Sequence, residues 1–253
     1  MKIVQPSYEI LTDISEGGIQ ELQSIEHAAR TCYKSEDKIS GDGESAKKLI
    51  KRLIESGHEA MLEHSSLSVK FICDRGVSHE IVRHRMASFA QESTRYCNYS
   101  KGKFGGEITV IEPVIFENIE STINEDELPF LYKALYLAQP KWAYDKLKAM
   151  DVLTKTYVLW MAHCQAANEV YNAMLEDGMT PEIARSVLPN SLKTEIVVTA
   201  NYREWRHIFD LRCDAAAHHE MRRLMRPLLE ELHKRIPVIF DDLYDHYFGT
   251  YKL

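Results

Sequence analysis

The stretch from Arg83 to Tyr96, RHRMASFAQESTRY, holds three arginines and a histidine within fourteen positions. A guanidinium group presents a planar fork of N–H donors that suits carboxylates and phosphates. Ser88, Gln91, Ser93 and Thr94 add neutral hydrogen-bonding groups beside these cations. The combination indicates a binding site for a phosphate and a planar polar ring.

The charge of the whole chain makes this stretch more informative. The 253 residues carry a formal net charge of −7, so the overall field repels nucleic acids and anionic membranes. We therefore expect neither as a partner. Any anionic ligand must be bound by a local positive site.

A purely structural interpretation of the arginines stays open. Arg83 and Arg85 can form ion pairs with Glu80, Glu92 or acids elsewhere in the chain, as many protein arginines do. If a helix capped by Ser78 continues through the Arg-His-Arg triplet, successive side chains point about 100° apart. At least one of the three cationic groups must then face the interior, a ligand or another subunit.

Ser93 raises the question of nucleophilic catalysis. An acyl-transfer serine needs a base within hydrogen-bond reach and an oxyanion hole. The sequence contains no GxSxG elbow, so Ser93 is interpreted as a binding hydroxyl.

Histidines next to glutamates suggest metal ligands, but their spacing argues against a metal site. His58 and His64 are six positions apart, and His79 and His84 are five apart, whereas HExxH places its histidines four apart. No Walker A loop or GxGxxG motif is present either. Basic side chains must therefore hold any nucleotide cofactor.

Composition limits the class of protein. No window approaches the roughly 20 apolar residues of a membrane span, and the N-terminus lacks a secretory signal, so a cytoplasmic protein is expected. The five cysteines are odd in number and form no CxxC pair, which indicates reduced packing residues.

The N-terminal half must position the stretch from Arg83 to Tyr96. Apolar residues recur every three or four positions from Gly18 to Tyr33 and from Glu44 to Ser56, which predicts two amphipathic helices, the second stopped by Gly57. Alternation from Leu67 to Cys73 predicts a strand, and Ser78 predicts the cap of a helix through Arg85.

Later elements follow in a helix-rich order without regular strand–helix alternation, which favours an α+β fold. They are a strand over Glu107 to Val114, two long helices over Leu128 to Asp177 broken near Met150, a short helix from Thr180-Pro181 ended by Pro189, a strand over Leu192 to Ala200, a helix from an Asn201 cap to Arg212, and a helix over Ala215 to Arg235. No linker or repeat divides the chain, so residues 1–253 are expected to form a single domain.

The sequence resembles the flavin-dependent thymidylate synthases. Their signature is Arg-His-Arg, seven residues, a serine and usually Xaa-Arg-Tyr, which corresponds to Arg83-His84-Arg85, Ser93 and Arg95-Tyr96. Flanking segments agree in order and approximate spacing over roughly residues 1 to 240. They are Ala28-Ala29-Arg30, Gly57-His58-Glu59, Leu62-Glu63-His64, Ala184 to Pro189, Asn201-Xaa-Arg203 and Leu211-Arg212.

The resemblance implies a helix-rich α+β domain with a small, mainly antiparallel sheet, of the thymidylate synthase-complementing protein type, assembled as a homotetramer with FAD between subunits. It also implies the reductive methylation of dUMP to dTMP, with 5,10-methylenetetrahydrofolate as carbon donor and NADPH as reductant through the flavin. Tetrahydrofolate is the other product, and no covalent enzyme nucleophile is expected.

Site residues are carried over by motif. The resemblance assigns Arg212 a catalytic role against the uracil ring, where its cation stabilises developing negative charge. The implied dUMP-binding residues are Glu80, Arg83, Gln91, Ser93, Thr94, Arg95, Arg185 and Arg212. The implied FAD-binding residues are His58, Glu63, Arg83, His84, Arg85, Gln91, Asn201, Arg203 and His207.

Four positions depart from the family pattern, and two other functions stay open. Glu80 stands where glutamine is also used, Gln91 where some relatives have glutamate, and Ala60 and Cys32 where a hydroxyl is frequent. One alternative is a nucleic-acid-binding module that uses the arginine cluster and stacks bases on Phe89, Tyr96 and Tyr99. The other is a flavoenzyme with a different acceptor.

Overall fold

The computed structural model describes residues 1–117 and 141–249. The chain divides into two compact units, each assembled from segments distant in sequence. Unit 1 contains Met1–Pro6, Cys73–Gly76 and Glu92–Thr194, and unit 2 contains Ser7–Ile72, Val77–Gln91 and Glu195–Leu253. The expectation of a single domain over residues 1–253 stays a prediction.

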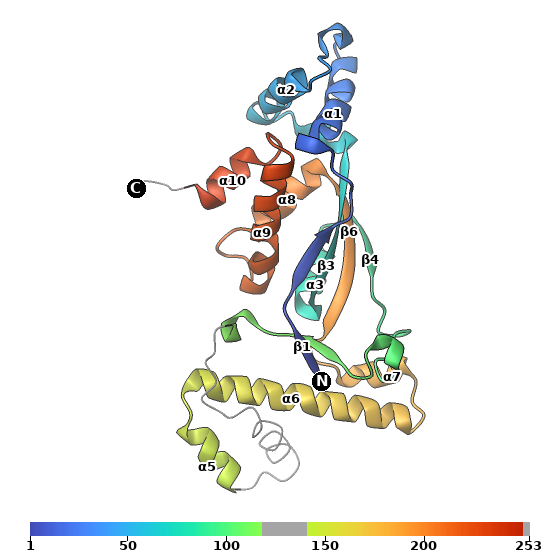
Figure 1. The fold of residues 1–253 in the computed structure, drawn as a ribbon, viewed down its shortest axis with the longest axis vertical. Coiled ribbons are helices and arrows are strands. Elements are labelled where there is room, and N and C mark those ends of the chain that lie inside the picture. The colour runs from blue at the N-terminus through green and yellow to red at the C-terminus, as the bar shows by residue number, and fades with distance from the viewer. Residues whose placement is uncertain (118–140, 250–253) are drawn as a thin grey trace. The chain divides into compact units, whose positions relative to one another are not determined.

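A four-stranded sheet has the strand order β2-β3-β6-β4 (Figure 1). The strands are β2 (Ser7–Ile10), β3 (Ser66–Asp74), β6 (Lys193–Asn201) and β4 (Ser88–Gln91). β2 pairs antiparallel with β3, and β4 pairs antiparallel with β6. The predicted small, mainly antiparallel sheet is therefore confirmed, although neither β2 nor β4 was expected from the sequence.

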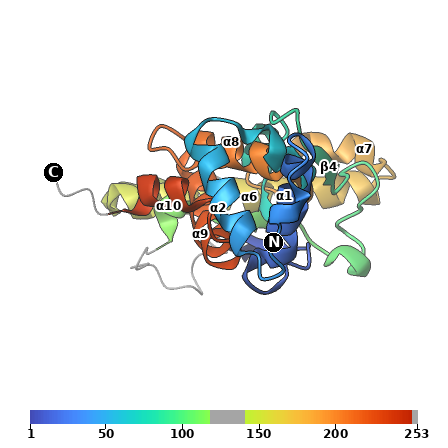
Figure 2. The same ribbon diagram turned by 90° about the horizontal axis from the view of Figure 1, so that it is seen from above.

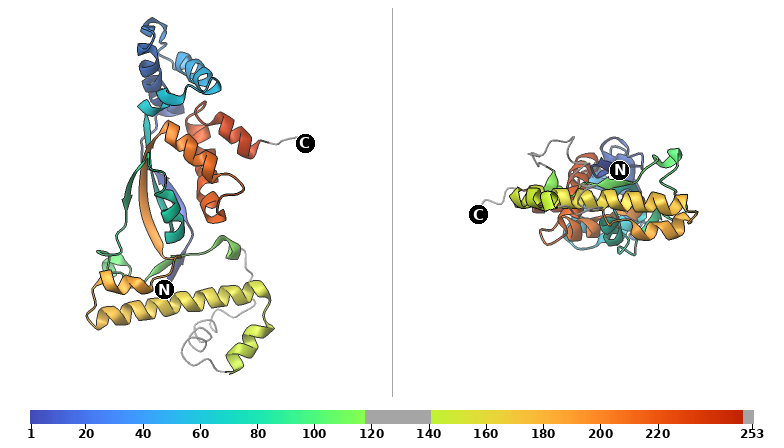
Figure 3. Two further views of the ribbon diagram at one scale, coloured as in Figure 1. Left: turned by 180° about the vertical axis from the view of Figure 1, so that it is seen from behind. Right: turned by 90° about the horizontal axis from the view of Figure 1, so that it is seen from below.

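The helices α8 (Tyr202–Arg212), α9 (His219–Arg235) and α10 (Asp241–Phe248) follow the last strand of unit 2 and lie together beside the sheet (Figures 1 and 3). Trp205 fixes α8 to β3: its indole N–H donates to the carbonyl of Leu67 at 3.0 Å, and its ring lies 6.3 Å from that of Phe71. Because a buried indole needs both apolar packing and a hydrogen-bond partner, this contact sets the position of α8.

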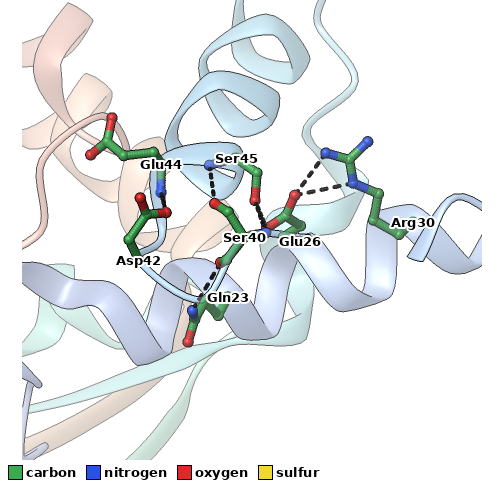
Figure 4. Close-up of polar contacts among 7 residues, drawn as sticks. All are labelled: Gln23, Glu26, Arg30, Ser40, Asp42, Glu44 and Ser45. Atoms are coloured by element: carbon green, nitrogen blue, oxygen red, sulfur yellow. Dashed lines mark hydrogen bonds and ion pairs between the residues drawn. The ribbon is translucent and has the colours of Figure 1, made fainter. Parts of the chain in front are cut away.

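The helices α1 (Ile19–Thr31) and α2 (Glu44–Glu55) lie side by side in unit 2 (Figure 2). The fully buried carboxylate of Glu26 joins them, since it accepts from both Nε and Nη2 of Arg30 and from the Ser45 hydroxyl at 2.7 Å (Figure 4). A buried charge is tolerated only when it is paired and hydrogen-bonded, so these partners stabilise the helix pair.

The end of α2 is fixed by the glycine that the sequence predicts as its stop. Gly57 has φ +71° and donates to the carbonyl of Ile54, while the N–H of His58 donates to the carbonyl of Leu53 at 2.8 Å. This pair of bonds is a Schellman motif, which requires a left-handed residue and therefore favours glycine. It delivers the chain into η3 (Glu59–His64) with His58 at the start.

Unit 1 contains a parallel strand pair and several helices. β1 (Lys2–Val4) pairs with β5 (Thr109–Ile111). The helices are α5 (Lys141–Ala149), α6 (Val152–Glu176) and α7 (Pro181–Ala184). Asp151 caps α6 by accepting from two backbone N–H groups at 3.0 Å, which confirms the predicted break. The part of the preceding predicted helix before residue 141 lies outside the described residues.

Short 3₁₀-helices complete the described secondary structure. They are η1 (Glu16–Gly18), η2 (Glu36–Lys38), η4 (Gly102–Phe104), η5 (Val114–Phe116) and η7 (Arg185–Val187), in addition to η3. Across residues 1–117 and 141–249, no helix combines the length and apolar character that a membrane span requires.

The expected helix through the arginine triplet is wrong in its bounds. The helix α3 covers Arg75–Ile81, so Ser78 lies inside it rather than at its cap, and the triplet follows in turns. Ser78 is buried, and its hydroxyl accepts a hydrogen bond from Gln91 at 2.9 Å. The side chain of Ser78 is thereby used for packing against β4 instead of for capping.

Candidate functional site

The three residues of the Arg83-His84-Arg85 triplet have different environments. Arg83 and Arg85 are exposed, whereas His84 is only 5% exposed. The side chain of His84 therefore faces the interior, as expected for one of the three. The residues point in different directions because the chain turns here, and not because they lie on a helix. Within the described ranges, neither arginine side chain has a hydrogen-bond or ion-pair partner.

The structural interpretation of these arginines named Glu80 and Glu92 as partners, and it is wrong for both. Glu80 forms an ion pair with Arg212 at 2.9 Å, and Glu92 forms one with Lys193 at 3.2 Å. Arg83 and Arg85 face solvent and are therefore available to bind an anion.

The imidazole of His84 lies among side chains of α8. Its Nε2 is 3.0 Å from Nε of Arg212, and its Nδ1 is 3.8 Å from Oε1 of Glu204. The ring of His207 meets it edge-on, with centroids 6.0 Å apart. Burial lowers the pKa of His84 to about 4, and the neighbouring Arg212 and His207 act in the same direction. His84 is therefore neutral near pH 7.

Arg212 is the last residue of α8 and is held by α3. Its Nη1 donates to the Glu80 carboxylate at 2.9 Å, and its Nη2 donates to the Glu80 carbonyl at 3.1 Å. His218 approaches the same carboxylate at 3.7 Å. The family departure at Glu80 thus supplies a negative charge next to the proposed catalytic cation.

A cavity of about 600 Å³ in unit 2 adjoins α8. Four residues of the implied FAD set line it: Glu63, Asn201, Arg203 and His207. The other lining residues are Glu59, Met86, Glu204, Arg206, Asp210, Asp242 and Leu243. Of the four residues from the implied FAD set, Glu63 lies on η3 and the other three lie at the start and in the middle of α8. These two elements are more than a hundred positions apart in the sequence.

The cap of α8 determines how Asn201 is presented. Its Oδ1 accepts from the N–H of Glu204 at 2.9 Å, which confirms the predicted N-cap. The cap uses the acceptor atom and leaves the amide NH₂ group as a donor. Two residues later, Arg203 donates to Glu63 at 2.5 Å in an exposed ion pair.

A second cavity, of about 920 Å³, lies in unit 2 between α1, α2 and η3. His58 and Arg203 of the implied FAD set line it, and Arg203 also lines the first cavity. The remaining charged lining consists of Arg30, Lys38 and Arg52 against the single carboxylate of Glu59. This donor set suits an anionic ligand such as a phosphate.

The departures at Ala60 and Cys32 fall in this second cavity. Ala60 has no polar side-chain atom, and the thiol of Cys32 is 3.9 Å from the carbonyl of Ala28 on its own helix. Neither replaces a hydroxyl donor fully, because a thiol is a weak donor. The basic side chains must supply the strong polar contacts of this cavity.

The remaining implied dUMP residues belong to unit 1. Thr94 is buried, and its hydroxyl accepts from Nη1 of Arg185 at 3.1 Å. Arg95 pairs with Glu182 at 3.1 Å. The Ser93 hydroxyl accepts from the N–H of Arg95 at 3.3 Å, and within the described part of unit 1 it has no histidine or carboxylate partner. This environment suits a binding hydroxyl.

The residues of the implied site belong to both units, as follows. Glu80, Arg83, His84, Arg85, Gln91, His58, Glu63, Asn201, Arg203, His207 and Arg212 belong to unit 2, and Ser93, Thr94, Arg95 and Arg185 belong to unit 1. In the described ranges, no group of three or more His, Cys, Asp or Glu side chains is arranged to hold a metal ion.

Several lining residues of the first cavity were missed by the sequence analysis. Glu204 lies three positions after the cap Asn201, so its place on the first turn of α8 could have been inferred. Asp242 and Leu243 of α10 carried no sequence signal. They reach the cavity only because the fold returns the C-terminal helix to α8.

Comparison with known proteins identifies the type of chain. A family described as thymidylate synthase complementing protein matches residues 19–238. A flavin-dependent thymidylate synthase from Corynebacterium aurimucosum is 32% identical over 233 residues, covering 92% of this chain and 84% of the relative. One from Corynebacterium efficiens is 33% identical over 239 residues, covering 94% and 84%.

A similar fold occurs among solved structures. The crystal structure of a UMP/dUMP methylase PolB from Streptomyces cacaoi, bound with 5-Br dUMP, aligns with a TM-score of 0.67 at 22% identity and covers 98% of both chains. The matched family region ends at residue 238, so α10 lies beyond it.

Proposed function

The chain belongs to the thymidylate synthase complementing protein family, and we propose that it is a flavin-dependent thymidylate synthase that converts dUMP to dTMP. The carbon donor is 5,10-methylenetetrahydrofolate, and NADPH is the reductant through bound FAD. The observation that carries this proposal is the contact of Arg212 with His84 of the signature triplet, beside a cavity lined by Asn201, Arg203 and His207.

The residues present fit an anionic cofactor with a planar ring. Arg30, Lys38, Arg52, His58 and Arg203 give the second cavity a basic lining that suits a diphosphate. The amide of Asn201 and the exposed imidazole of His207 offer hydrogen bonds in the first cavity. We assign FAD to these residues together with Glu63, Gln91 and the two exposed arginines of the triplet, Arg83 and Arg85.

The protein's contribution to the reaction is orientation and electrostatics. When bound, FAD supplies the electron transfer. Arg212 lies against the uracil ring and stabilises negative charge at N3 and the neighbouring carbonyl as it develops. A preorganised cation acts without reorganisation at the moment of reaction, and its contacts with Glu80 and His84 provide that preorganisation.

The dUMP contacts come from both ends of the signature. Arg83, Arg95 and Arg185 supply charge for the phosphate, and Glu80, Gln91, Ser93 and Thr94 supply hydrogen-bonding groups. The bond from Arg185 to the buried Thr94 supports this grouping, because it holds one guanidinium beside the polar turn that follows the triplet.

Replacing Ser93 tests the non-covalent role of this residue. Ser93→Ala removes one hydrogen bond to dUMP, so its affinity should fall about tenfold while product still forms. Thr94→Ser serves as a matched control, because it changes the neighbouring residue but keeps a hydroxyl group at position 94. Complete loss of product with intact dUMP affinity would instead identify Ser93 as a nucleophile.

The assembly and location follow the same assignment. We propose a homotetramer in the cytoplasm in which active sites use residues of more than one chain. Sedimentation of the FAD-loaded protein measures the assembly directly, and a monomer that turns over would contradict shared sites.

Two measurements test the reaction. The first is the visible spectrum of the purified protein before and after anaerobic NADPH is added with dUMP; a yellow protein that bleaches supports flavin reduction. The second is tritium release from dUMP labelled at C5 when methylenetetrahydrofolate is present. Bleaching without tritium release would indicate a flavoenzyme with another acceptor.

A nucleic-acid-binding module predicts a different result. Such a protein would bind RNA or DNA with a steep dependence on salt concentration. A colourless protein that takes up no FAD and binds nucleic acid in this way would overturn the enzyme assignment.

A further inference from the structure

We propose that His84 is a positioning residue for Arg212: the imidazole acts as a neutral acceptor that, with Glu80, orients the guanidinium for the pyrimidine. This inference rests on the proposed thymidylate synthase function and goes beyond it. The resemblance assigns His84 to the flavin, and it says nothing of a contact between His84 and Arg212.

The direction of the hydrogen bond between these residues follows from their chemistry. An arginine has five N–H donors and no acceptor, so Nε of Arg212 must donate across the 3.0 Å to Nε2 of His84. Nε2 therefore carries a lone pair, and the ring proton of the neutral tautomer lies on Nδ1. A protonated His84 could not form this bond, because both partners would be donors.

Burial of His84 and its two basic neighbours favour the neutral form and outweigh the nearby carboxylate of Glu204. Arg212 and His207 of α8 approach it on one side, and a proton on Nε2 would bring a second positive charge within about 3 Å of the guanidinium. Glu204, also of α8, lies 3.8 Å from Nδ1, at which the neutral tautomer has its N–H group. The Glu80 carboxylate forms its ion pair with Arg212, at 2.9 Å, and not with His84.

Three contacts fix the plane of the Arg212 guanidinium. Nε donates to His84, Nη1 to the Glu80 carboxylate and Nη2 to the Glu80 carbonyl. Each of the two Nη atoms retains one N–H group without a partner in the described chain. Because the guanidinium is rigid and planar, fixing three donors also fixes the directions of the other two.

This assignment gives His84 a different task from that of its neighbours. Arg83 and Arg85 are exposed cations that suit phosphate binding, while His84 is buried and supplies an acceptor. A substitution that preserves an acceptor should therefore preserve function better than one that introduces a positive charge. A phosphate contact to the flavin predicts the opposite order.

Three variants separate these roles. His84→Gln keeps an acceptor without charge, His84→Lys introduces a positive charge and removes the acceptor, and His84→Leu has neither. The measured quantities are kcat/KM for dUMP, the Kd for FAD from flavin fluorescence, and the thermal unfolding midpoint. We expect His84→Gln to lose less than about tenfold in kcat/KM, and the other two about a hundredfold, as expected for a displaced catalytic group.

Flavin affinity provides the opposing readout. In each folded variant, the Kd for FAD should change by less than about threefold, since the proposed loss concerns the orientation of Arg212. If His84→Gln loses FAD and His84→Lys retains it, His84 is a phosphate contact and the positioning role is overturned. If a leucine or lysine variant does not fold, the glutamine variant and the following cycle still decide.

A double-mutant cycle tests whether His84 acts through Arg212. His84→Gln and Arg212→Lys are measured singly and together, because lysine has no Nε–H donor for the contact. We expect His84→Gln to add less than about twofold in the Arg212→Lys background. Independent, multiplicative losses would overturn the proposal even if the wild-type enzyme forms dTMP. A wild-type protein that binds FAD but forms no dTMP would instead overturn the proposed function.

Discussion

Arg206 and Arg212 lie on the same helix, α8, but their guanidinium groups have opposite relations to their surroundings. Arg206 is buried and uses all four Nη hydrogens: it donates to the Ile239 carbonyl, to both oxygens of Asp242 and to Glu59. Arg212 is less buried and has two Nη hydrogens without partners in the described residues. Six positions separate them, so their side chains point about 120° apart.

The difference shows what distinguishes a structural from a functional arginine. The Asp242 and Glu59 carboxylates outweigh the burial that would otherwise lower the pKa of Arg206, so its pKa is raised and its charge is fixed. Every Nη donor is consumed in joining α8, η3 and α10. Arg212 is held firmly by one carboxylate and one neutral imidazole, yet it retains donors for a ligand. The sequence predicts both as arginines of the same helix. Only their hydrogen-bond partners in the folded structure distinguish the structural one from the functional one.

The largest expected effect is on stability, from Arg206→Leu. The substitution leaves the Asp242 and Glu59 carboxylates and the Ile239 carbonyl without their donor, and we expect a loss of about 4 kcal/mol in the free energy of unfolding. Urea denaturation measures it. Arg235→Leu removes an exposed pair with Glu231 and should cost less than about 1 kcal/mol. Equal losses in the two variants would contradict the structural role of Arg206.

Arg212→Ala should have the opposite effect: a large loss of activity and a smaller loss of stability. We expect kcat/KM for dTMP formation to fall by at least about a hundredfold, corresponding to roughly 3 kcal/mol of transition-state stabilisation, while FAD stays bound. Stability should change less than in Arg206→Leu, because the Glu80 carboxylate is partly exposed to water. Unchanged turnover would remove the catalytic role of Arg212.

A smaller effect concerns the pH dependence of stability through His84. The pKa of this residue is about 4 in the folded protein against 6.5 ordinarily, so the unfolded chain binds the proton first as pH falls. The stabilising contribution is complete above pH 6.5 and is lost as pH falls toward 4, by on the order of 2 to 3 kcal/mol.

The control for this prediction is His84→Gln, which does not titrate. Unfolding free energies measured from pH 7 to pH 4 should fall more steeply in the wild type than in this variant. Other carboxylates titrate in both proteins, so the difference between the two slopes isolates His84. Parallel slopes would contradict the neutral, buried state.

The smallest expected effect is from Arg203→Ala, on the exposed turn of α8. Its pair with Glu63 is about half exposed, so the free energy of unfolding should fall by roughly 0.5 kcal/mol. The affinity for FAD should nevertheless fall, since Arg203 lines both cavities. Flavin fluorescence titration measures the change, and unchanged affinity would exclude Arg203 from the cofactor site.

Much of the scaffold followed from local sequence. The periodicity of α1 and α2, the alternation of β3, the stop at Gly57 and the cap at Asn201 depend on neighbouring residues alone, and each is confirmed. The strand expected from Glu107 to Val114 shrinks to Thr109–Ile111, because only three residues pair with β1. The strand β4 was missed, since four residues next to a polar turn carry little alternation.

The sequence by itself determined the family signature, the helix-rich α+β fold and the order of the elements that carry the site. It did so because caps, turns and amphipathic patterns act over a few residues. Tertiary structure alone decided which basic side chain of the triplet is buried, which arginine of α8 has all four Nη hydrogens bonded, and that Glu80 pairs with Arg212. These outcomes depend on burial and on partners that lie from 33 to 147 positions away, which no local pattern encodes.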